Sequence, residues 1–120
     1  MATQLKIETI VNLVDSVNPS IVNKVLSNVN TITCTSREFG VQYMPANTTN
    51  VALAENVEYV YIFSPMPIQI VISEHESGNN IATLTTQQFS YQNKDLAIDV
   101  IISNNNSEAF EVEYVTAVIE

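Results

Sequence analysis

The chain has 120 residues, among them 13 acidic and four basic residues, one histidine, one cysteine, two glycines and no tryptophan. The formal charge of −9 argues against nucleic-acid binding, because phosphate contacts need clustered Lys and Arg. The same counts exclude an internal disulfide framework, a Cys-rich zinc site and a glycine-rich phosphate loop.

Apolar residues make up 46% of the chain and charged residues only 14%, which predicts a folded domain. No apolar run reaches the ~18 residues that a membrane span needs. The first residues lack the charged and apolar regions of a signal peptide. We therefore expect no membrane partner, and synthesis in a cytoplasm with Cys34 reduced.

The N-terminal third gives two competing signals. An alternation of apolar residues from Leu5 predicts a strand to about Val14, although a helical spacing also fits. Asn18-Pro19 is typical of a helix start, whereas the β-branched residues that follow are mediocre helix formers. Residues 19–29 are therefore predicted to form either one short helix or a strand.

Residues 30–35 alternate threonine with Ile and Cys, which predicts a strand, and residues 38–49 are interpreted as a long loop. The middle of the chain gives the clearest signal. Residues 57–63 are apolar on both parities and residues 68–72 alternate strictly, with prolines between them. Because proline cannot donate to a ladder, we predict two antiparallel strands joined by a proline turn at residues 64–67. The first strand should be central and covered on both faces.

The last third continues this pattern. Residues 81–85, 96–102 and 110–118 are predicted strands, and the Asn-rich residues 104–107 are a predicted turn. Short strands separated by turn signals indicate an all-β fold, a β-sandwich or jelly-roll-like domain over residues 1–120 with a short N-terminal arm.

Several residues are of types that can carry out chemistry. Glu74-His75-Glu76 could seed a metal site, but adjacent strand residues point to opposite faces, so a solvated loop is expected. Cys34 and His75 could pair as nucleophile and base, but nothing local supports this and we expect Cys34 to be a buried, inert thiol.

Two pairs of acids, Asp95 with Asp99 and Glu111 with Glu113, could serve glycosidic chemistry. Sugar clefts usually add aromatic platforms, and tryptophan is absent. We interpret the acids as solvated strand faces or as contacts with a neighbouring subunit. We expect no enzymatic activity, no metal and no cofactor.

Two segments place Met and Pro together in predicted loops, a composition that favours partner contacts. The predicted interface residues are Met44, Pro45, Pro65, Met66 and Pro67. The alternative is that Met44 and Met66 plug the ends of the core.

The stretch from Val57 to Ile70, VEYVYIFSPMPIQI, resembles a pattern in small virion proteins of tailed bacteriophages: an aromatic-rich strand, a proline turn and an alternating strand. The resemblance continues loosely through residues 96–102 and 110–117 and covers about half the chain. It implies a small β-sandwich that serves as a capsid decoration protein, head–tail connector or tail component. The missing glycine in the proline turn and the acidic loop around His75 depart from the pattern.

Three classes of function are candidates for this sequence. The first is a non-enzymatic virion protein, most simply a capsid decoration (cement) protein made in the host bacterial cytoplasm, forming a homo-oligomer and contacting capsid or connector proteins. The second is a carbohydrate- or host-surface-binding module, for which Tyr43, Tyr59, Tyr91 and Glu76 are the candidates. The third, a small hydrolase, lacks a nucleophile–base pair, a metal cluster and an oxyanion motif.

Overall fold

The computed structural model describes residues 3–14, 17–18 and 22–120, and these form strands and turns without a helix. The all-β prediction is therefore confirmed. The seven strands are β1 (Thr3–Val14), β2 (Val22–Met44), β3 (Thr48–Val57), β4 (Tyr59–Glu74), β5 (Asn80–Gln92), β6 (Ile98–Asn104) and β7 (Phe110–Ile119). Residues 19–29 were predicted to form either a helix or a strand. Residues 22–29 are strand, and residues 19–21 lie outside the described part.

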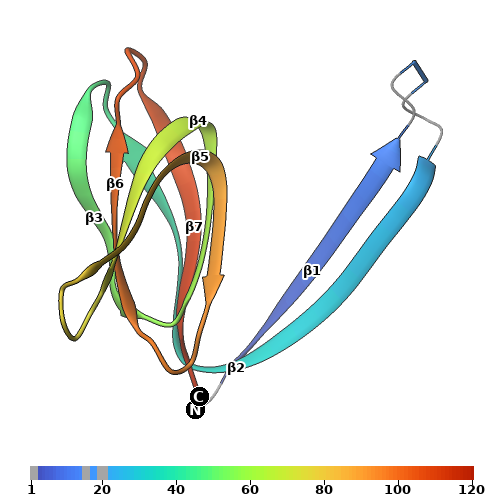
Figure 1. Ribbon diagram of the computed structural model, residues 1–120, viewed down its shortest axis with the longest axis horizontal. Helices are drawn as coiled ribbons and strands as arrows, with labels where there is room; N and C mark the ends of the chain where they lie inside the picture. Colours follow the sequence, from blue (N-terminus) through green and yellow to red (C-terminus); the bar gives the residue numbers. More distant parts are fainter. Residues whose placement is uncertain (1–2, 15–16, 19–21) are drawn as a thin grey trace.

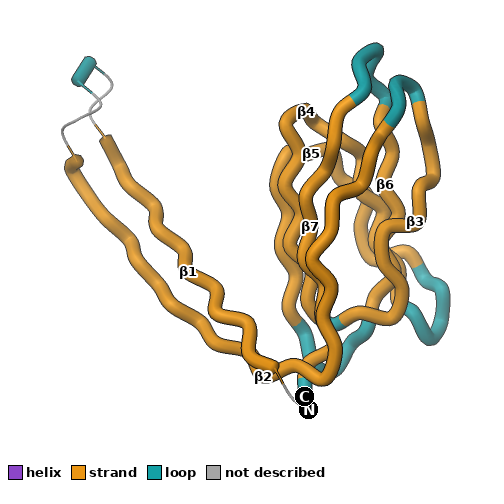
Figure 2. The backbone as a smooth tube through the Cα atoms, turned by 180° about the vertical axis from the view of Figure 1, so that it is seen from behind, coloured by secondary structure: helices purple, strands orange, loops and turns teal. Residues whose placement is uncertain are grey.

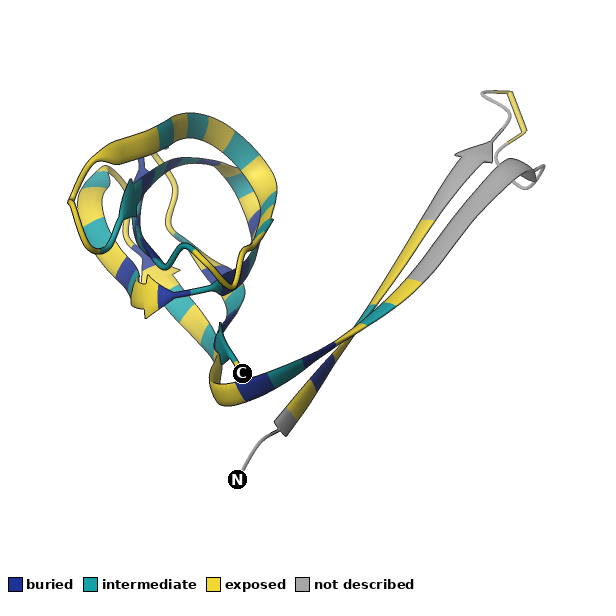
Figure 3. Cartoon of the chain, turned by 60° about the horizontal axis from the view of Figure 1, so that its bottom comes forward, coloured by how far each residue is buried: buried dark blue, intermediate teal, exposed yellow. Residues whose placement is uncertain are grey.

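The strands form one antiparallel sheet in the order β1-β2-β7-β4-β6-β3, with β5 paired to β4. The sheet curls back on itself and encloses the core (Figure 3). Strand β4 makes the curl possible because its first half, Tyr59–Phe63, pairs with β7 and its second half, Gln69–Glu74, pairs with β6.

The proline segment interrupts β4 without ending it, which corrects the predicted turn. Residues 57–63 and 68–72 are not antiparallel partners, because β4 runs through the prolines and pairs with β5 on both sides of them. Phe63 lies opposite Gln88 and Ile68 opposite Thr86, so four residues of β4 face one residue of β5. The prolines occupy this bulge, where no ladder donor is needed.

The predicted long loop at residues 38–49 is also wrong. Strand β2 continues to Met44, and its second half pairs with β7 from Arg37 to Met44. A short turn follows, with Asn47 at a φ of 56°, and β3 begins at Thr48. Asparagine adopts this left-handed conformation more readily than most residues.

The core confirms the alternation in the central strands. Isoleucines and valines at alternate positions of β4 and β6 are almost fully buried: Ile68, Ile70, Ile72, Ile98, Val100 and Ile102. The first half of β4 is central, as predicted, but it is not covered on both faces. Val60 and Ile62 are buried in the core, whereas Phe63 on the opposite face is 46% exposed.

The β1–β2 hairpin extends away from the curled body as a two-stranded ribbon (Figures 1 and 2). Its pairing runs from Thr3 opposite Cys34 to Val14 opposite Val22. We use "the ribbon" for Thr3–Val14 with Val22–Cys34, and "the body" for residues 35–120. At the ribbon's root, a second apolar cluster joins ribbon and body through Leu5, Ile32, Cys34, Tyr59 and Ala117.

Candidate assembly surface

The predicted interface residues do not all reach the surface. Met44 is fully buried in the main core, so its side chain packs as a plug and offers no contact to a partner. Pro45, Pro65 and Pro67 are exposed, and Met66 is partly buried.

Two asparagines hold the exposed prolines at one end of the body. Asn104 Nδ2 donates to the backbone carbonyls of Met44 and Pro45, at 3.3 and 3.0 Å, and of Glu108, at 2.9 Å. Asn106 Nδ2 donates to the carbonyl of Pro67 at 2.8 Å. The turn after β2, the β4 bulge and the loop after β6 therefore meet at the end of the body opposite the ribbon's root (Figure 1).

A larger apolar surface lies on the outer face of β2, β7 and β4, and the sequence analysis did not predict it. On β2, Phe39, Val41 and Tyr43 share this face and are 61%, 57% and 59% exposed. Polar and apolar residues alternate from Glu38 to Tyr43, which is typical of a strand. Because residues 38–49 were interpreted as a loop, this alternation was not used to predict an exposed strand face.

The register of the strands aligns residues of β2, β7 and β4 in rows, so this face continues across all three strands. Val115 of β7 lies between Phe39 of β2 and Tyr61 of β4, and Glu113 lies between Val41 and Phe63. We call this surface "the apolar face" and define it by six side chains: Phe39, Val41, Tyr43, Tyr61, Phe63 and Val115.

The apolar face is hollowed. One depression of about 350 Å³ lies over Phe39, Tyr61 and Val115. A second, of about 630 Å³, shares these three residues and reaches Ile7 and Ile10 of β1, in the open angle between ribbon and body. The two depressions share these residues and form one trough. The part over the apolar face is mainly apolar, whereas the part that reaches β1 is mixed, with Lys6, Glu8 and Gln88 among its lining residues.

Beyond its root the ribbon exposes apolar side chains. Ile10 is 65% exposed, Val29 is 55% exposed, and Val17 at the turn between the strands is 91% exposed. The outer edge of β1 pairs with no other described strand. An isolated two-stranded hairpin is marginally stable in water, so this ribbon lacks the cover that such an element normally needs.

The accessible surface and the radius of gyration also show that part of the chain is not packed against the rest. Its accessible surface is 7459 Å², whereas a compact monomer of 13.3 kDa exposes about 6,500 Å². Its radius of gyration is 16.2 Å, against about 13.5 Å for a compact domain of this length. The excess of about 1,000 Å² exceeds the roughly 800 Å² that one partner contributes to a standard interface.

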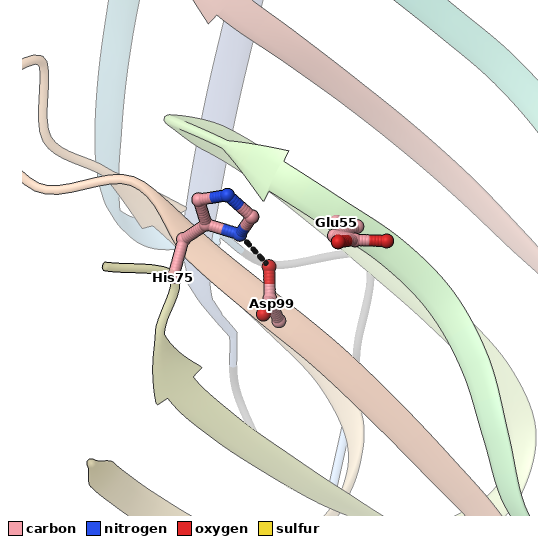
Figure 4. Close-up of side chains that lie close together, drawn as sticks. All are labelled: Glu55, His75 and Asp99. Atoms are coloured by element: carbon pink, nitrogen blue, oxygen red, sulfur yellow. Dashed lines mark hydrogen bonds and ion pairs between the residues drawn. The ribbon is translucent and has the colours of Figure 1, made fainter. Parts of the chain in front are cut away.

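A polar cluster lies near the opposite edge of the sheet, at the turn between β4 and β5 (Figure 4). His75 Nδ1 and Asp99 Oδ1 are 2.8 Å apart, and Asp99 Oδ1 also accepts from the Asn56 backbone N–H at 2.9 Å. The hydrogen bond to Asp99 raises the pKa of His75, and the carboxylates of Glu55 and Glu76 add to the effect.

This cluster differs from the Glu74-His75-Glu76 group considered from the sequence. Glu55, His75 and Asp99 each offer one possible metal ligand, and these atoms lie within 4.8 Å of one another. Glu74 instead accepts from the Ser77 hydroxyl at 2.6 Å. Pairing with His75 and Asn56 already accounts for the position of Asp99. Glu55 and Asp99 lie at least 20 residues from His75 in sequence, so no local signal could have found them.

The remaining sequence candidates do not form a catalytic site in the described residues. Cys34 is fully buried, as predicted, and burial raises the pKa of its thiol, which opposes thiolate chemistry. Tyr59 is buried at the ribbon's root, so it offers no sugar platform beside the exposed Tyr43. Glu111 and Glu113 are exposed on the apolar side of β7.

Comparison with known proteins gives no match: neither a family model nor a curated protein nor a solved structure corresponds to this chain. In the described residues no helix has the length and apolarity to cross a membrane. Any inference about function therefore depends on three structural features: the ribbon, the apolar face and the polar cluster.

Proposed function

We propose that this chain is a non-enzymatic structural subunit of a tailed-bacteriophage virion, used in many copies as a capsid decoration (cement) protein. The assignment to a virion comes from the resemblance of residues 57–70 to small phage virion proteins. The assignment to a repeated structural subunit has separate support in the ribbon and the apolar face.

The observation that carries the proposal is the ribbon. A hairpin of this length spans about 40 Å, and among the described side chains the ribbon packs on the body at its root, through Leu5, Ile32 and Cys34. A subunit that works alone gains nothing from such an element. A subunit that assembles gains a contact that reaches a neighbour, which is how extended arms act in multi-copy structures.

The end of the body that carries Pro45, Pro65 and Pro67 is the proposed contact with other virion proteins. Its prolines are rigid, and their carbonyls are held by side chains, so little conformational entropy is lost when this end is covered. A head–tail connector or a tail component would use the same surfaces, and it would differ from a decoration protein in its partner.

The test is the native mass of the full chain in solution. We expect light scattering to give one discrete oligomer in the micromolar range, with no hydrolytic activity detected on ester, peptide or glycoside substrates. A chain that stays monomeric up to about 100 µM, a concentration at which an interface with a dissociation constant of about 1 µM would be largely occupied, would contradict a self-assembling subunit. Binding to a glycan array by such a monomer would support the carbohydrate-binding alternative instead.

A further inference from the structure

We propose that the ribbon of one copy docks in the trough on the apolar face of a second copy. This inference rests on the proposed function, because it identifies the partner of the ribbon as another copy of the same chain. Four observations support it: the location of exposed apolar residues, the charge of each part, the area left uncovered, and the residues that line the trough.

Exposed apolar residues gather in two places. Eight large apolar side chains are strongly exposed among the described residues, and six of them lie on the ribbon or on the apolar face. The ribbon has two, Ile10 and Val29, and the apolar face has four, Phe39, Val41, Tyr43 and Phe63. Burying two such surfaces against each other removes apolar area from water on both partners.

The charge distribution selects ribbon-on-body contact over body-on-body contact. Residues 1–34 contain two acids and two bases and are neutral, whereas residues 35–120 contain eleven acids and two bases. The whole formal charge of −9 therefore lies in the body. Two bodies that met through their apolar faces would also bring Glu111 and Glu113 of both copies together, and like charges in an interface cost several kcal/mol. A neutral ribbon avoids this repulsion.

A ribbon cannot cover the apolar face of its own chain. Its root is fixed by the packing of Leu5, Ile32 and Cys34 on Tyr59 and Ala117, and beyond this root it runs away from the body (Figure 2). The trough stays open at the angle between them. Ile7, Phe39 and Tyr61 offer apolar contacts in the trough, and Lys6, Glu8 and Gln88 offer polar ones. A ribbon that exposes both kinds of side chain suits this mixed lining.

The contact joins two different surfaces, so each copy contributes one ribbon and one apolar face. Such a contact closes as a reciprocal pair or as a ring, and a rotation that does not close would extend it into a filament. The discrete oligomer that we expect corresponds to a closed form. Each form uses the excess surface of about 1,000 Å² per chain, which is enough for a stable interface.

The test uses two variants of the full chain. The ribbon variant is Val29→Asp, at a position that lines neither depression, and the face variant is Phe39→Asp with Val41→Asp. All three positions are exposed, so each variant should keep the thermal transition of its core. We expect each variant alone to be monomeric by light scattering, with self-association at least about 100-fold weaker, equivalent to about 2.7 kcal/mol.

Mixing the two variants gives the decisive result. The ribbon variant keeps an intact apolar face and the face variant keeps an intact ribbon, so a one-to-one mixture should form a complex of two chains. A face-to-face interface predicts the opposite, because the ribbon variant alone would still assemble and mixing would rescue nothing. Met66→Asp, at the far end of the body, is the matched control and should assemble as the wild type does.

The outcomes separate this inference from the proposed function. If the wild type is oligomeric and the ribbon variant has the same mass, ribbon docking is wrong and the structural role stands. If Met66→Asp dissociates the oligomer and the ribbon variant does not, the proline end is the self-contact instead. A wild type that is monomeric at all concentrations contradicts the structural role itself.

Discussion

The ring of Tyr114 on β7 lies across Gly40 on β2 and occupies the space that a side chain at residue 40 would need. The two residues are direct partners in the ladder, and the Tyr114 hydroxyl donates to Glu38 Oε1 at 2.8 Å. This hydrogen bond and the burial of the ring raise the pKa of Tyr114. Gly40 is therefore required for close packing, because the missing Cβ lets a tyrosine span the β2–β7 pair.

We expect Gly40→Ala to destabilise the chain by about 1–3 kcal/mol, the usual cost of overpacking a filled site. The added methyl group would overlap the Tyr114 ring and force it away from Glu38. Urea unfolding measures the change. In a Tyr114→Leu background the same substitution should cost much less, and equal costs in both backgrounds would rule out the steric explanation.

Asn104 is fully buried and ties the turn after β2 to the loop after β6 through hydrogen bonds to three carbonyls. Asn104→Ala leaves those carbonyls without their donor in a buried setting, so we expect a loss of about 2–4 kcal/mol. Asn105→Ala, at an exposed neighbour, should change stability by less than about 0.5 kcal/mol. Similar small effects for both variants in urea unfolding would contradict the bracing role of Asn104.

Local patterns in the sequence predicted what depends on neighbours along the chain. The alternation of Ile68, Ile70 and Ile72 indicated a buried strand, and burial followed the predicted parity. The same local rules failed at the prolines. Proline excludes a ladder hydrogen bond but does not dictate a chain reversal, and here a four-residue bulge satisfies the same constraint within one strand.

The assembly surface could not be predicted because it depends on register between distant strands. Phe39, Val115 and Tyr61 form one row only when β2, β7 and β4 are placed side by side. The pairing of Asp99 with His75 likewise depends on β6 reaching the β4–β5 turn. The composition shows that the chain is acidic. That the net negative charge lies in the body and not in the ribbon becomes visible only when the structure separates the two parts.

The rate at which the Cys34 thiol reacts with a reagent can measure how often the root of the ribbon opens. Its thiol is fully buried, and burial raises its pKa, so both access and thiolate formation are suppressed. We expect a thiol reagent that labels the unfolded chain at once to label the native chain only through opening of this cluster. Leu5→Ala should speed labelling at least about tenfold, because such truncations cost about 2–5 kcal/mol of local packing.

The matched control for this labelling experiment is Leu53→Ala, which truncates a leucine of similar burial in the main core. If the ribbon root opens separately from the body, Leu53→Ala should speed labelling less than Leu5→Ala at equal loss of global stability. Equal acceleration by both variants would mean that Cys34 becomes accessible only when the whole chain unfolds.

The His75–Asp99 pair makes stability depend on pH in a defined direction. The hydrogen bond to Asp99 raises the pKa of His75 above its ordinary value of about 6.5. The folded state therefore binds this proton more tightly than the unfolded state. The resulting stabilisation is complete below the unfolded pKa of about 6.5 and is lost as pH rises through the higher folded value.

We expect the thermal transition of the wild type, measured relative to that of His75→Gln, to fall as pH rises above the unfolded pKa of about 6.5. Asp99→Asn removes the acceptor charge that faces the imidazole, so it should flatten the difference over the same range. Glu76→Gln is the milder control, because Glu76 acts on His75 only through its charge at a distance. Parallel pH profiles for the wild type and His75→Gln would show that the pair contributes nothing to folding, and a profile that rises with pH would contradict the direction of the pKa shift.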